Sequence, residues 1–267
     1  HNVDILAGHE NYSWERKLTS GMNSNMAAAG NLTMGNFLEN SFFDGSDDVD
    51  KTESYLGRIR YNYDEKYFAD FSYRRDGSSR FAKDARWGDF YSFGLNWNAK
   101  KENFLQGVEW LNDLRVRASY GEVGNNAGVS LYAYQSLYEI NKNGGNAAFI
   151  SQSLPAPNIK WETTQTVDLG IEGKLFDRLN FSFGYFDKRS KDLLFEVRLP
   201  YSAGSYPHND SMTNWSIYQN IGTISNRGFE IALSGEIIKN KDWNWTVSAD
   251  ATTLKNKVIK LPGGKDI

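Results

Sequence analysis

Apolar and polar residues alternate along this chain in runs whose connections are alternately short and long. In residues 55–63 the odd positions are mainly aromatic or aliphatic, whereas Arg58 and Arg60 take the opposite face. After a turn of three residues the same pattern resumes in residues 67–73. Successive side chains of a β-strand point to opposite faces, so each run has one apolar and one polar surface. An aromatic-rich apolar face, with tight turns at one end and large loops at the other, is typical of a transmembrane β-barrel.

The pattern predicts about nine strands, separated by turn residues. Long connections are expected at residues 9–53, 121–160 and 200–225, and a moderate one with a helical turn at 99–111. A run at residues 192–199 is expected to extend the strand before it. The predicted strands are residues 1–8, 54–63, 67–75, 87–98, 112–120, 161–175, 179–189, 226–238 and 243–254.

Composition agrees with a membrane protein that spans as strands. The 267 residues are 15% aromatic and have a mean hydropathy of -0.60. No apolar run approaches the roughly 20 residues of a membrane-spanning helix. The alternative is a soluble all-β surface module that binds glycans, since such folds alternate equally well. A sandwich has no reason to keep long loops at every second connection, and strands of about nine or more residues suit a tilted span. We therefore favour the barrel.

Charge and cysteine content exclude several other classes of protein. The net charge of -3 gives no support to a nucleic-acid partner, and the absence of cysteine excludes disulfides and thiolate metal sites. The chain opens directly in a strand-like run, with no signal peptide. An odd number of strands does not close a single-chain bacterial barrel. We therefore expect residues 1–267 to be part of one larger barrel domain, whose remaining strands and lumen filling lie outside this sequence.

Five local blocks make the class more specific. The first is FSYRRDGSSRF at residues 71–81, followed by RWG at 86–88. The others are WLNDLRVRASYG (110–121), NIKWETT (158–164), YFDKRSKDLL (185–194) and NIGTISNRGFE (220–230). In this order they resemble the SusC/RagA-like TonB-dependent transporters of Bacteroidetes outer membranes. The resemblance covers residues 55 to about 261 and is highly specific.

That resemblance implies a position in the bacterial outer membrane and import of glycans or peptides, driven through TonB. In this family a plug domain fills the lumen and a SusD-like lipoprotein caps the barrel from outside. The expected partners are therefore that lipoprotein, TonB acting through the missing plug region, outer-membrane lipids, and an oligosaccharide or peptide substrate. No cofactor and no nucleic acid are expected. A passive porin wall, in which no plug exists, is a third alternative.

A motif at the predicted barrel rim consists of Arg74, Arg75, Asp76, Gly77, Arg80, Arg86 and Trp87. Asp76-Gly77 is a favoured turn pair, because glycine tolerates a positive φ. We favour local pairing of the arginines with Asp76 and Asp84 over contact with substrate or lipopolysaccharide. Four further arginines face the lumen and either line a transport path or pair with plug carboxylates: Arg58, Arg60, Arg115 and Arg117.

No catalytic or metal site is predicted. The three histidines, His1, His9 and His208, lie at the terminus or in expected loops, and no nucleophile motif accompanies them. An acidic cluster in the first long connection consists of Asp47, Asp48 and Asp50. We interpret this cluster as a solvated loop, because it lacks the spacing and final glutamate of an EF-hand calcium site.

Aromatic residues in the long connections are the candidate binding residues. Flat aromatic faces stack on sugars and also anchor protein partners. We hypothesise that the connections 121–160 and 200–225 capture substrate or hold the lipoprotein lid, against the plainer reading that they pack on themselves. The candidates are Tyr132, Tyr134, Tyr138, Tyr201, Tyr206, Trp215 and Tyr218.

Overall fold

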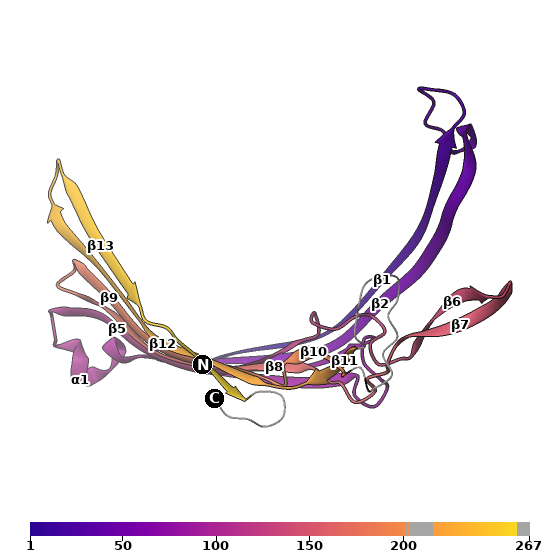
Figure 1. Cartoon of the computed structure of the whole chain (residues 1–267). Coiled ribbons are helices and arrows are strands. Elements are labelled where there is room, and N and C mark those ends of the chain that lie inside the picture. Colours follow the sequence, from indigo (N-terminus) through magenta and orange to yellow (C-terminus); the bar gives the residue numbers. More distant parts are fainter. Residues whose placement is uncertain (201, 203–215, 261–267) are drawn as a thin grey trace.

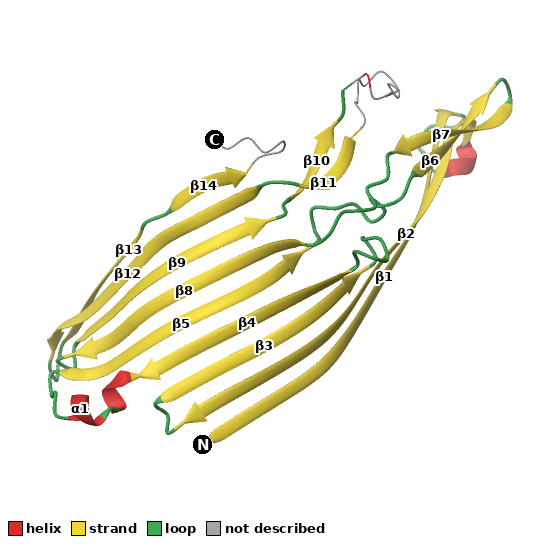
Figure 2. Cartoon of the chain, turned by 90° about the horizontal axis from the view of Figure 1, so that it is seen from below, coloured by secondary structure: helices red, strands yellow, loops and turns green. Residues whose placement is uncertain are grey.

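One antiparallel sheet, curved into a trough, makes up most of the molecule (Figure 1). The computed structural model describes residues 1–200, 202 and 216–260. Neighbouring strands follow the order β1-β2-β3-β4-β5-β8-β9-β12-β13, and β14 also pairs with β12. Figure 2 shows the strands side by side, with α1 at one end and the long connections at the other. The strands are β1 (Asn2–Met26), β2 (Phe37–Tyr63), β3 (Tyr67–Ser78), β4 (Trp87–Asn98), β5 (Leu111–Asn125), β8 (Glu162–Leu175), β9 (Leu179–Lys191), β12 (Thr223–Lys239), β13 (Asn244–Thr252) and β14 (Lys255–Lys260).

The nine consecutive neighbours β1 to β13 of this sheet confirm the strands predicted from the alternation. The predicted helical turn is also confirmed, since η2 and α1 connect β4 to β5. Among the described residues, none of the helices has the length and apolar content needed to cross a lipid bilayer. The smaller elements are η1 (Met34–Asn36), η2 (Ala99–Lys101), α1 (Asn103–Gln106) and two paired ribbons, β6 (Leu137–Asn143) with β7 (Asn146–Ser153) and β10 (Leu194–Arg198) with β11 (Ser216–Asn220).

Two predicted boundaries are wrong. Residues 9–53 are not a loop, because β1 and β2 remain paired from Asn2↔Asn62 to Met26↔Phe37 and project beyond the sheet (Figure 1). Beyond the rim both faces of this hairpin are solvated, so backbone hydrogen bonds hold it without an apolar face. Residues 192–199 do not extend β9 either. Asp192 has a φ of 53°, and β10 then pairs with β11 instead.

The outward face of the sheet carries a continuous apolar band. Strand pairing places Phe71 opposite both Ile59 and Phe93, and Phe93 opposite Tyr120. Directly opposed side chains share a face. Ile59, Phe71, Phe93 and Tyr120 are 47%, 44%, 46% and 37% exposed, because no second layer of the described chain covers them. An exposed apolar face of this extent suits the hydrocarbon of a membrane.

The opposite face is polar and encloses a hollow of about 580 Å³ whose lining includes Asp70, Arg117 and Asp168. Asp70 receives Arg58 Nε at 2.7 Å and Arg60 Nε at 3.4 Å. Likewise, Arg115 lies 3.2 Å from Asp113. Three of the four inward arginines therefore already have carboxylate partners within the sheet, which the sequence alone did not indicate.

A carboxylate organises the aromatic residues at the short-turn end. Glu102 accepts hydrogen bonds from the Tyr67 hydroxyl at 2.5 Å and from Trp97 Nε1 at 3.2 Å, and Lys66 Nζ lies 3.8 Å away. These contacts, the Tyr67 hydrogen bond above all, lower the pKa of Glu102 from its usual 4.5. Glu102 lies in the connection between β4 and β5, outside the spanning strands. Its contacts fix the orientation of two rings at the membrane boundary.

We predict that Glu102→Ala lowers the urea midpoint of unfolding of the complete receptor at pH 7. Because the pKa of Glu102 is lowered in the folded protein, its stabilisation is present above about pH 4.5 and is lost as the pH falls through the folded-state value. The difference between the variant and wild type should therefore disappear in strong acid. Glu109→Ala is the control, since exposed Glu109 pairs with no described residue. If the urea midpoints of Glu102→Ala and wild type differed by the same amount at every pH, the ionised Glu102 carboxylate would not be the source of the stabilisation.

Candidate functional site

The rim motif ties together the strands at the long-loop end. Arg74 donates from Nε to Asp76 at 2.7 Å, which is the local ion pair indicated by the sequence. Its Nη2 also reaches Ser54 Oγ at 3.1 Å and Glu10 Oε2 at 3.2 Å. One arginine thus links β3 with β2 and β1. This network fixes the spacing of the three strands where the sheet leaves the apolar band.

Gly77 is not a turn residue, contrary to the sequence prediction. It lies within β3, directly opposite Trp87 of β4. A Cβ atom at this position would lie 2.9 Å from the Trp87 ring, closer than packing allows. The face of Trp87 also receives the guanidinium of Arg75 at 5.4 Å, and Arg75 Nε is 3.9 Å from Asp89. Glycine is therefore needed for the close approach of an aromatic ring.

Arg80 anchors the projecting hairpin to a neighbouring loop. It contacts Asp50 Oδ2 through Nη2 at 2.7 Å and through Nε at 3.2 Å. From the other side, its Nη1 donates to the carbonyl oxygens of Val129 at 3.0 Å and Asn126 at 3.5 Å. The partner of Arg80 is thus Asp50 of the acidic cluster, and not Asp76 or Asp84. The interpretation of the acidic cluster as a solvated loop is therefore wrong for Asp50, whose side chain is part of the framework.

The other two acidic residues of the cluster, Asp47 and Asp48, lie on β2, and His9 lies on β1. Asp47 and Asp48 are paired in register with Lys17 and Arg16 of β1. His9 lies inside β1, where its Nε2 is 3.3 Å from Glu53, and not in a loop. Among the described residues, no group of three or more His, Asp or Glu side chains is arranged to hold a metal ion. His208 lies outside the described residues.

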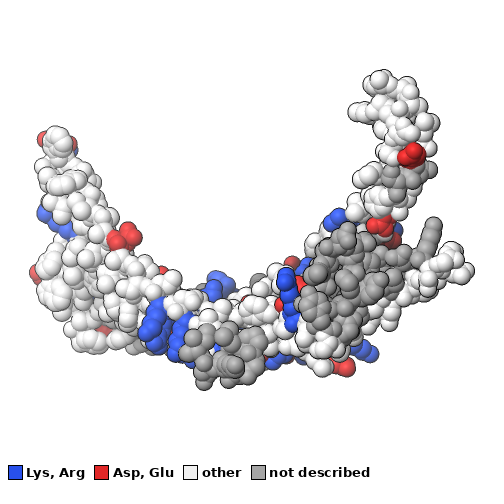
Figure 3. Space-filling model, in the orientation of Figure 1, with Lys and Arg blue, Asp and Glu red and all other residues white. Residues whose placement is uncertain are grey.

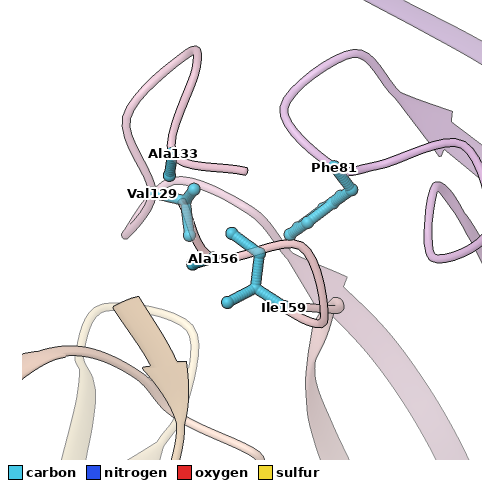
Figure 4. Close-up of a cluster of buried hydrophobic side chains, with 5 residues drawn as sticks. All are labelled: Phe81, Val129, Ala133, Ala156 and Ile159. Carbon is cyan, nitrogen blue, oxygen red and sulfur yellow. The ribbon is translucent and has the colours of Figure 1, made fainter. Parts of the chain in front are cut away.

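Three connections meet in a small buried cluster, which we call the loop core: Phe81, Val129, Ala133, Ala156 and Ile159. Figure 4 shows these side chains converging from separate segments. Phe81, the last residue of the RRDGSSRF run, is fully buried and lies 5.4 Å from the Trp161 ring. The family motif therefore positions a hydrophobic anchor for the loops.

Trp161 connects this loop core to the sheet. Its Nε1 donates to the carbonyl oxygen of Arg86 at 2.8 Å, and its ring meets Phe90 edge-on at 5.8 Å. Phe90 in turn occupies the space above two glycines. A Cβ on Gly124 would lie 2.1 Å from Phe90 Cζ, and one on Gly88 would lie 2.7 Å from it. Arg86 does not form the predicted rim pair with any described residue, and its Nε is buried without a hydrogen-bond partner.

Asn220 joins three of the five sequence blocks. Its side chain accepts from Lys160 N and donates to Lys160 O, both at 2.8 Å. The same amide donates to the carbonyl oxygen of Asp192 at 2.8 Å. Next to it, Tyr218 and Gln219 line a hollow of about 500 Å³, in which Lys160 Nζ and Asp192 form an ion pair of 2.8 Å. This hollow offers an aromatic ring, an amide and paired charges at the long-loop end.

The structure describes four of the seven predicted aromatic residues, and the surroundings of these four differ. Tyr132 hydrogen-bonds the hairpin through Val49 N at 2.9 Å, and Tyr134 receives Gln135 Nε2 at 2.5 Å. Tyr218 packs against the loop core, whereas Tyr138 of β6 is 62% exposed. Tyr201, Tyr206 and Trp215 lie outside the described residues. Sequence reasoning missed Phe81, Trp161 and Asn220, although each stands in a block that carries the family resemblance.

The single-layer sheet, with an apolar outer face, a polar trough and long connections at one end, defines a segment of transmembrane β-barrel wall. The sequence matches the family described as "TonB dependent receptor-like, beta-barrel" over residues 2–266. The chain belongs to this family of outer-membrane proteins. The soluble surface module considered from the sequence is thereby excluded.

Sequence comparison with individual proteins shows which members of the family this chain is similar to. The chain is 37% identical over 221 residues to TonB-dependent receptor SusC of Bacteroides thetaiotaomicron, covering 80% of this chain and 21% of SusC. It is 36% identical over 219 residues to TonB-dependent receptor P3 of Formosa agariphila, again covering 80% of this chain and 21% of the relative. The chain therefore spans about a fifth of the length of these relatives.

Solved structures agree on the architecture. The RagAB peptide transporter superposes with a TM-score of 0.86 at 27% identity, covering 98% of this chain and 29% of that one. The siderophore receptor PirA from Pseudomonas aeruginosa gives a TM-score of 0.54 at 13% identity, covering 95% of this chain and 44% of that chain, and shows the fold alone.

We predict that Gly77→Ala displaces Trp87, because the added methyl group lies within 3.0 Å of three ring atoms. A clash of this kind costs about 1–3 kcal/mol when the surroundings must move. Trp87 fluorescence in the complete receptor should shift, and the heat-modifiable folded band should decrease. Gly57→Ala is the matched control, since its Cβ would meet nothing within 4 Å. Equal behaviour of the two variants would rule out a steric role for Gly77.

Proposed function

We propose that this chain forms part of the wall and outer loops of an energised outer-membrane importer for oligosaccharides or peptides. The proposal rests on the two faces of the sheet. The outward face is apolar, and the inward face holds a polar hollow lined by Arg58, Asp70 and Arg117. Such a wall separates lipid from an aqueous or protein-filled lumen. The similarity to the RagAB peptide transporter supports peptides, and the five sequence blocks that resemble the SusC/RagA-like transporters support both substrate classes.

We further propose that all of residues 1–267 belong to one barrel domain. Within the described residues β1 and β13 each pair with the sheet on one side only. Unpaired backbone groups in lipid each cost several kcal/mol, so both edges require further strands. In this proposal a plug fills the lumen, TonB acts on that plug, and no chemical step takes place in the barrel.

The long-loop end is the proposed docking surface for a SusD-like lipoprotein. Its loops are held in place by the loop core, so they present a preorganised surface. Tyr218, Gln219 and the ion pair of Lys160 with Asp192 border the hollow on this side. Aromatic side chains next to satisfied polar groups are typical anchors for proteins and for sugars.

Uptake in cells with and without TonB tests the proposed importer. We expect uptake of labelled oligosaccharide or peptide pools by the complete receptor to fall to background when TonB is removed. Surface binding should persist, because capture at the loops precedes the energised step. Undiminished uptake without TonB would favour a passive porin and overturn the proposal. Immunoblotting of outer membranes verifies equal receptor levels in both strains.

Tyr218→Ala tests the docking or capture role of the loops. We expect about tenfold weaker substrate binding or lipoprotein association, the size of an interface anchor. Phe104→Ala is the control, because Phe104 is a 69% exposed aromatic residue on α1 at the opposite end. Co-purification of the lipoprotein and binding of substrate are both measured. If neither changes in the Tyr218 variant, the loops serve only their own packing.

A further inference from the structure

Basic side chains gather on the outward face at the long-loop end of β9, β12 and β14. Strand pairing places Arg227 opposite Lys255 on one side and Asp187 on the other. In the next row Ser225 lies opposite Lys257 and Arg189. Opposed residues share a face, and Phe229, two positions from Arg227, belongs to the outward band. We call the following five residues the basic patch: Arg189, Lys191, Arg227, Lys255 and Lys257.

Among the described residues, the basic patch carries more positive than negative charge. On β9, β12 and β14, the acidic residue in these rows is Asp187. Its carboxylate accepts two hydrogen bonds from Arg189, of 2.7 and 3.1 Å. No carboxylate of the described residues lies within ion-pair distance of the four other members. Arg227, Lys255 and Lys257 are exposed. In Figure 3, Lys and Arg side chains gather on the lower, convex side of the sheet, beside the atoms drawn in grey.

Elsewhere on the outward face, charges at this end are balanced. Arg75 lies beside Asp89 and over the Trp87 ring. The same face of β2 and β5 carries the acidic residues Glu53 and Glu122, which accept hydrogen bonds from Tyr55 and Tyr120. The surplus of positive charge is therefore local to β9, β12 and β14. A general excess of basic residues does not explain it, since the whole chain has a net charge of -3.

The basic patch lies at the level of lipid headgroups. Immediately below it along the strands, the rings of Tyr185 and Phe229 pack at 5.2 Å. Aromatic rings of this kind mark the boundary between hydrocarbon and headgroups. Arginine and lysine side chains that form no ion pair with a described residue, just beyond that boundary and on the face that meets lipid, are complementary to lipid phosphates.

We propose that the basic patch binds the phosphate groups of an anionic lipid in the outer leaflet. Arg227 offers the forked donor geometry that holds two phosphate oxygens, while Lys255 and Lys257 supply adjacent mobile ammonium groups. Such contacts would fix the orientation of this side of the barrel in the bilayer. The inference requires the barrel to lie in the outer membrane but is independent of what the barrel transports.

The test compares two triple variants of the complete receptor in neutral detergent. The patch variant carries Arg227→Gln, Lys255→Gln and Lys257→Gln, and leaves the Asp187–Arg189 pair intact. The probe is a fluorescent diphosphorylated lipid A. We expect its affinity for the patch variant to fall roughly 100-fold, from three headgroup-level charges. Wild type should lose affinity similarly when the same lipid is dephosphorylated, a measurement that does not depend on the folding of any variant.

The control variant carries Lys83→Gln, Lys188→Gln and Lys241→Gln and loses the same charge. Lys188 lies between Asp187 and Arg189 on the opposite face of β9, and the other two lie outside the strands. It should bind like wild type. Equal affinity of the patch variant and wild type would overturn the proposal, as would equal losses in both variants. Displacement of the lipid by millimolar inorganic phosphate would also overturn it, by assigning the site to a soluble anion.

Discussion

The structure depends on one constraint: in lipid, every backbone N–H and C=O must find its partner on a neighbouring strand. Continuous ladders between β2, β3, β4, β5, β8, β9 and β12 meet that requirement. The ladders fix the register, and the register decides which side chains stand in the same row. Ile59, Phe71 and Phe93 consequently meet on the outward face, while Arg58 and Asp70 meet on the inward one. The two environments of the wall thus follow from backbone pairing.

At the long-loop end, water can hydrogen-bond to backbone groups that no strand pairs. Contacts between side chains, and not backbone ladders, hold the connections together there. A membrane wall alone would permit loose connections here, yet Arg80, Phe81 and Trp161 join them into one unit. A motif rich in arginine and glycine invites interpretation as a ligand site. In this chain Arg74 is paired with Asp76, Arg80 is paired with Asp50 and a backbone carbonyl, and Gly77 makes room for a ring.

The strands were predictable because a period of two is visible within one segment, as in residues 55–63. Turn preferences alone misled at Gly77, since only the opposing strand reveals that Trp87 lies against it. The hairpin of β1 and β2 was missed because solvated faces leave no apolar alternation to detect. The loop core was missed for a different reason: Phe81, Val129 and Ile159 are far apart in sequence and meet only in the folded chain. Long-range contacts of this kind carry no local signal.

The length of that hairpin has a mechanical consequence. β2 pairs with β3 only from Thr52 onward, so residues 37–51 extend about 50 Å past the last three-stranded row at roughly 3.3 Å per residue. At its root, Asp50 is held by Arg80 and Val49 by Tyr132, both contacts coming from neighbouring loops. The hairpin is therefore a long arm that the neighbouring loops hold at its root. A rotation of the hairpin by about 10° about this root would move its tip by about 9 Å over the length of about 50 Å. Small displacements of the loops would therefore become larger displacements of the hairpin tip at the cell surface.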